Sequence, residues 1–156
     1  MASPSATPND TDDGETAYLE ARLPHSAAAP REAREAVSKL CDAGALPPSV
    51  RPDLLLLVSE VVTIAVLDES RSAETPLVLT AARNNGLVRV TLADSGRGFT
   101  ERAEQTESYG IYLLDQVATR WGVEALAEGD AGTRVWFELT TKRDPYSHAR
   151  QHRLAI

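Results

Sequence analysis

The sequence predicts an α+β domain: a two-layer sandwich in which one mixed, mainly antiparallel sheet is covered by helices on one face. Three observations predict this class. Short stretches of alternating apolar residues indicate strands, and longer apolar or amphipathic stretches indicate helices. Two turn signals, Asn84-Asn85-Gly86 and residues 129–132, indicate hairpins. The predicted order is one strand, two helices, a hairpin, a loop, a helix and a second hairpin.

The chain has 156 residues, which is enough for one such domain. We expect the domain to span residues 16–141. Residues 1–15 mix Pro, Ser, Thr, Asp and Gly with almost nothing to bury, so they are expected to form a disordered tail. Residues 142–156 show no periodicity and are expected to form a loose tail.

Composition excludes several classes of function. The formal net charge of -7 argues against broad contact with a nucleic-acid backbone. No apolar run approaches the roughly 20 residues of a membrane span, and the N-terminus resembles no leader peptide, so a cytoplasmic location is expected. Cys41 is the single cysteine, which leaves neither a disulfide nor a zinc cluster and predicts a small buried side chain near a helix end.

The first half of the chain predicts an edge strand and two helices. Alternation over residues 16–23 indicates a strand that stops at Pro24. Ser26 or Pro30 is expected to open a helix that ends at Gly44. Residues 54–67 are apolar almost all round, which predicts a helix covered on more than one side, with Ser49 as its N-cap.

The second half predicts two hairpins separated by a helix. Asn85-Gly86 tolerates positive φ at both turn positions and is a strong hairpin signal. The predicted strands and helix are, in chain order, strands 77–82 and 87–93, helix 109–121, and strands 123–127 and 133–140.

A strand that ends in Asp94-Ser95-Gly96-Arg97-Gly98 is informative by itself. Glycines let the backbone approach a flat ligand closely, and the Asp94 carboxylate could accept hydrogen bonds from an exocyclic amine. On this segment alone, a tight surface turn is an equally good interpretation, because Asp and Gly dominate turns.

Four segments together are more specific: LLLLVSEVVTIAV, VRVTLADSGRGF, YGIYLLDQVATRWGVE and AGTRVWFEL. They resemble the N box, G1 box, G2 box and final Gly-Thr strand of the GHKL ATPases. More narrowly, they resemble the histidine-kinase-like domains of bacterial anti-sigma regulatory factors, the serine/threonine switch kinases. The resemblance covers residues 17–139 and implies the Bergerat fold and a homodimer.

The resemblance also implies site residues. Asp94 would recognise the adenine amine, Gly96 and Gly98 would shape the floor of the pocket, and Thr133 would assist near the base. Gly110 would be the second glycine of the G2 box and open a helix whose N-terminal amides face the phosphates.

Glu60 corresponds to the acidic residue that serves as general base toward a partner's serine, although a salt-bridge role for a lone Glu on an apolar helix stays open. One turn later the family places an Asn that ligates magnesium, and here that position is Ile64.

The lid segment over the nucleotide, residues 100–108, also departs from the family pattern. Ser108-Tyr109-Gly110 replaces Gly-x-Gly, and acidic residues dominate residues 101–107, which disfavours a triphosphate.

Three functions follow as hypotheses. The first is an anti-sigma-like regulator that binds a sigma factor, an anti-anti-sigma (STAS-type) antagonist or both, with ATP or ADP bound weakly if at all and magnesium not used. The second is an active serine protein kinase in which Asp68 or Glu69 supplies the missing ligand. The third is a structural dimer module without a ligand.

Overall fold

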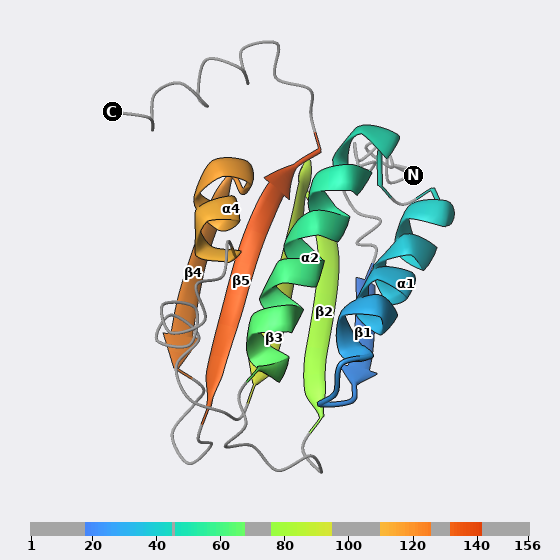
Figure 1. Cartoon of the computed structure of the whole chain (residues 1–156). Coiled ribbons are helices and arrows are strands. Elements are labelled where there is room, and N and C mark those ends of the chain that lie inside the picture. The colour runs from blue at the N-terminus through green and yellow to red at the C-terminus, as the bar shows by residue number, and fades with distance from the viewer. Residues whose placement is uncertain (1–17, 45, 68–75, 95–109, 126–131, 142–156) are drawn as a thin grey trace, which may run out of the picture.

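The computed structural model describes residues 18–44, 46–67, 76–94, 110–125 and 132–141. These residues form two layers, a five-stranded sheet and helices that lie on one of its faces (Figure 1). This confirms the predicted α+β sandwich. In chain order the elements are β1 (Tyr18–Leu23), α1 (Ala29–Asp42), the short 3-10 helix η2 (Pro48–Val50), α2 (Arg51–Val66), β2 (Leu77–Asn84), β3 (Leu87–Asp94), α4 (Gly110–Val117), β4 (Arg120–Ala125) and β5 (Thr133–Thr140).

The strand order across the sheet is β1-β2-β3-β5-β4. All four pairings among these strands are antiparallel, in line with the predicted mainly antiparallel sheet; none of them is of the parallel kind that a mixed sheet would also contain. β1 lies at one edge, as predicted, and β4 lies at the other.

Alternation along the strands builds the core. Every second residue of the three central strands faces the helices and is buried, because side chains of a strand point to opposite faces in turn. The buried residues are Leu77, Leu79 and Ala81 in β2, Val88, Val90 and Leu92 in β3, and Val135, Phe137 and Leu139 in β5.

The helices close this core from one side. α1 buries Ala29, Ala33 and Val37 along one stripe. α2 packs against both α1 and α4, which explains why it is apolar over most of its circumference. Among the described residues, no helix is long and apolar enough to cross a membrane.

The β2–β3 hairpin turns as predicted, with positive φ at Asn85 (49°) and Gly86 (74°). Gly44 follows α1 with φ 76°, as expected of a helix end.

Two predicted boundaries are wrong. Ser49 does not cap α2, because the 3-10 turn η2 already contains it and Val50 takes the N-cap position without a side-chain bond. The predicted helix 109–121 ends at Val117, and Arg120 and Trp121 instead begin β4, where they pair with β5. Pairing with a neighbouring strand outweighs the local helical pattern there. The expected tails, 1–15 and 142–156, lie outside the described residues.

Candidate functional site

Asp94 and Thr133 are brought together by the sheet. Asp94 ends β3, Thr133 begins β5, and the two are direct partners in the antiparallel register. Asp94 continues the helix-facing row of β3 and is 3% exposed. A buried carboxylate is costly unless it is hydrogen-bonded or paired, and Asp94 does have a partner interaction in the structure. A buried carboxylate beside a threonine thus marks this end of the sheet.

Of the other residues assigned to the adenine pocket, the structure describes Gly110. It is buried and is the first residue of α4, which packs on α2. Gly96 and Gly98 lie outside the described residues. The roles predicted for these residues in the adenine pocket therefore stay predictions. What the structure shows is that the end of β3 and the start of β5 are paired, which brings Asp94 and Thr133 together.

Glu60 and Ile64 lie one turn apart on α2. Four residues of a helix rise about 6 Å. Glu60 is half-buried, whereas Ile64 has no exposed surface and belongs to the core cluster. Position 64 therefore presents hydrocarbon packed in the core.

Three polar residues near Glu60 were not identified from the sequence. Arg34 of α1 donates from its guanidinium to the Ser59 hydroxyl at 2.9 Å. Thr63 donates its hydroxyl to the Ser59 carbonyl at 2.7 Å. Arg34 and Ser59 are 25 positions apart, so no local pattern reveals the contact. The Arg34–Ser59 hydrogen bond thus joins α1 to α2 at the residue that precedes Glu60.

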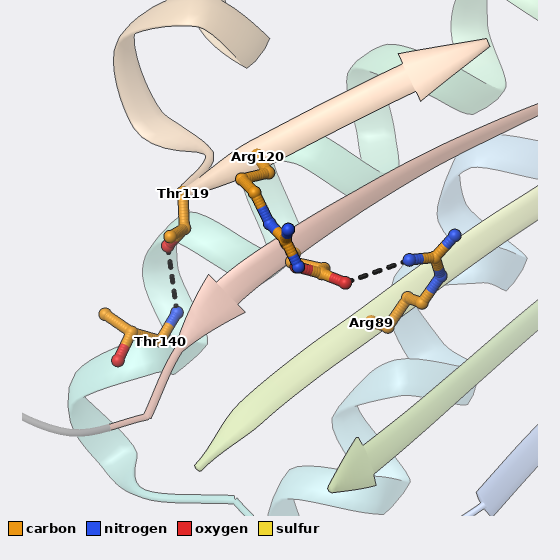
Figure 2. A network of polar contacts seen from close by, with 5 residues as sticks. Arg89, Thr119, Arg120 and Thr140 are labelled. Carbon is orange, nitrogen blue, oxygen red and sulfur yellow. Dashed lines mark hydrogen bonds and ion pairs between the residues drawn. The ribbon is translucent and has the colours of Figure 1, made fainter. Parts of the chain in front are cut away.

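A second polar group, on the sheet face that carries no helix among the described residues, was also missed. Glu138 is only 5% exposed and forms ion pairs with arginines of both neighbouring strands; these arginines, Arg89 and Arg120, are labelled in Figure 2. Arg89 of β3 contacts one carboxylate oxygen at 2.9 Å, and Arg120 of β4 contacts the other at 2.7 Å. Burial would raise the pKa of Glu138, but hydrogen bonds and charge from Arg120 and Arg89 outweigh it and lower the pKa below its usual value.

An aromatic ring lies against this ion-pair group. The guanidinium carbon of Arg89 is 4.1 Å from the centre of the Trp136 ring. The ring also lies over Gly122 of β4, where a Cβ atom would come within 2.9 Å of it. Gly122 is therefore needed so that the indole can lie against the sheet. Residues 120–123 (Arg-Trp-Gly-Val) and 135–139 (Val-Trp-Phe-Glu-Leu) are therefore in direct contact, through Gly122 and the Trp136 ring.

The chemistry of these side chains determines which groups of a ligand they could bind. A carboxylate such as that of Asp94 can accept hydrogen bonds from an exocyclic amine, which is the role predicted for it beside Thr133. Magnesium requires oxygen ligands, and the Ile64 side chain supplies no oxygen at its position on α2. Among the described residues, no three His, Cys, Asp or Glu side chains gather as a metal site. The prediction that no metal is bound remains a prediction.

No protein-family model matches the chain. No curated protein matches it significantly. Twelve chains of solved structures match significantly. One is the crystal structure of the RsbU and RsbW domains of Rv1364c from Mycobacterium tuberculosis, with a TM-score of 0.63 and 20% sequence identity. The match covers 81% of this chain and 32% of that longer chain. At this identity the likeness shows the fold alone, so the chain shares its two-layer α/β fold with part of the mycobacterial protein.

Proposed function

We propose that the chain is an anti-sigma-like regulatory protein that binds a sigma factor, an anti-anti-sigma (STAS-type) antagonist or both. Its use of Mg-ATP is weakened or lost. The shared fold supports the class of protein, on the inference that the matched part of the mycobacterial chain is its RsbW domain. The four resembling segments support the same class.

The burial of Ile64 carries the non-catalytic version of this proposal. Phosphoryl transfer depends on positioning and on neutralising charge with a metal ion. A fully buried hydrocarbon side chain, one turn beyond the candidate base Glu60, provides no ligand for that ion. The domain would keep the fold and the Asp94–Thr133 end of the sheet, and it would lose efficient phosphoryl transfer.

The solvent side of α2 is the surface we assign to the protein partner. Leu56 and Leu67 are 39% and 49% exposed, which is high for leucine in a core helix. With Glu60 and Thr63 between them, they follow one helical stripe at spacings of three or four residues. Exposed apolar residues interleaved with Glu60 and Thr63 give a mixed surface of the kind that binds proteins.

The test uses purified sigma factors and STAS-type proteins that are encoded in the same genome as this chain. We expect one of them to bind the full chain, and Leu56→Asp to weaken that complex at least tenfold while Arg31→Gln on the far side of α1 leaves it unchanged. Binding by none of the candidates would count against the proposal.

Labelled ATP separates the regulator from an active kinase. The proposal expects no transfer of phosphate to the bound partner with magnesium present. Transfer that disappears in Glu60→Ala would instead establish the kinase and the role of Glu60 as its base.

A further inference from the structure

The sheet face that carries no described helix holds a positively charged group, which we call the arginine cluster: Arg89, Arg120, Glu138 and Trp136. Figure 2 shows its two arginines, Arg89 on β3 and Arg120 on β4. Its two guanidinium ions share one carboxylate, so the cluster has a net charge of +1. Glu138 is covered, but the side chains of Arg89 and Arg120 remain 42% and 66% exposed. A guanidinium has five N–H donors, and Glu138 uses only some of them. The cluster can therefore receive a further carboxylate.

The cluster lies in the same cross-strand row as the first residue of β1. Tyr18 pairs with Ala82, Ala82 with Arg89, Arg89 with Glu138, and Glu138 with Arg120. Neighbouring strands are about 4.8 Å apart, which places Arg89 roughly 10 Å and Arg120 roughly 19 Å from the start of β1. The chain before Tyr18 thus joins the sheet at the end of the row that holds the cluster.

That preceding segment, residues 1–17, is acidic. It contains no Lys or Arg and carries four acidic residues: Asp10, Asp12, Asp13 and Glu15. It offers almost nothing apolar to bury, so charge is the main interaction available to it. An extended residue spans about 3.3 Å, so Glu15 can reach about 10 Å and Asp12 about 20 Å from Tyr18. These reaches match the positions of Arg89 and Arg120.

We propose that the acidic segment 1–17 docks on the arginine cluster of its own chain. Attachment to β1 holds the carboxylates near the cluster at a high effective concentration. The contact is electrostatic and is therefore weakened by salt. Arg and Trp are enriched at protein interfaces, so the docked segment would also compete with any partner that uses this face. The inference does not depend on the proposed function.

The test neutralises the segment without touching the folded part of the chain. Nuclear magnetic resonance of the full-length D10N/D12N/D13N/E15Q variant is compared with that of the unchanged chain at 0.02 M and 0.5 M NaCl. We expect the Trp136 indole and the Arg89 and Arg120 Nε signals to shift in the variant, and high salt to shift the unchanged chain the same way. The Trp121 indole, which donates to Asp115 at 2.8 Å on the helix side, should not move.

A matched control removes the same amount of charge from α1 and α2 in the variant E32Q/E35Q/D42N/D53N and should leave the Trp136 signal in place. Arg120→Gln should abolish the response to neutralising the segment. Identical Trp136 and arginine signals in the unchanged chain and the D10N/D12N/D13N/E15Q variant would overturn the proposal. So would a shift that fades on tenfold dilution, because it would mean that the segment binds a second copy.

Discussion

Ile64 lies one turn beyond Glu60 on α2, and its side chain is fully buried while that of Glu60 is partly exposed. The helix therefore has a carboxylate at position 60 and no side-chain oxygen one turn later, at position 64. In the proposed function, this relationship is what distinguishes a binding regulator from a kinase.

Ile64→Asn should restore an amide oxygen at this position. Burying an amide among apolar side chains should lower the free energy of unfolding by about 2–5 kcal/mol, measured by urea denaturation. In the folded variant, ATP binding should become at least tenfold tighter when magnesium is added.

Ile64→Val is the matched control, because it removes one methylene and adds no ligand. It should lower the free energy of unfolding by about 0.5–1.5 kcal/mol and leave magnesium without effect. Equal responses of the two variants to magnesium would show that position 64 does not determine metal use.

Glu138→Gln should destabilise the chain in a pH-dependent way. The lowered pKa means that the ionised carboxylate stabilises the fold above the ordinary glutamate pKa of about 4.3, and that this contribution is lost as pH falls through the lower, folded-state value. At pH 7 the loss should be about 1.5–3 kcal/mol, measured by urea unfolding, and it should shrink toward pH 3. Glu35→Gln, which breaks an exposed pair with Arg31, should change little at either pH. A penalty for Glu138→Gln that is the same at both pH values would contradict the account.

Gly122→Ala should reduce stability by about 1–3 kcal/mol, because the new Cβ meets the Trp136 ring. In a Trp136→Ala background the sign should reverse, since alanine is favoured over glycine within a strand by about 0.5–1 kcal/mol. A double-mutant cycle of thermal or urea unfolding measures this coupling. Additive effects would mean that the ring does not lie over Gly122.

The Cys41 thiol should react slowly with alkylating reagents. Burial raises its pKa, and Arg51 opposes that rise only in part. Because the thiolate is the reactive form, alkylation at pH 8 should be slower than in the urea-unfolded chain and should accelerate as pH rises. Equal rates in the folded and unfolded chain would be inconsistent with the half-buried position of Cys41.

Local chemistry made part of the fold predictable. Asn85-Gly86 sets its own turn geometry, and alternation along β3 marks its buried face. Boundaries that depend on distant partners were not predictable. Arg120 and Trp121 continue a helical pattern in the sequence but pair with β5. Ser49 lies in the 3-10 turn η2, which begins at the second of two consecutive prolines.

The site shows the same division. Asp94 could be singled out because it ends a strand beside glycines. Thr133 was assigned to the same site only through the family resemblance, and its pairing with Asp94 is seen only in the structure. The ion pairs of Glu138 join residues 49 and 18 positions away, and no local spacing marks such contacts.

Calorimetric titration of ATP into the full chain, with and without magnesium, distinguishes a regulator from an Mg-ATP enzyme. We expect weak or no heat of binding and no strengthening by magnesium. A tight signal that requires magnesium would show that α2 and its surroundings still hold the metal, and the assignment as a regulator without Mg-ATP chemistry would be wrong.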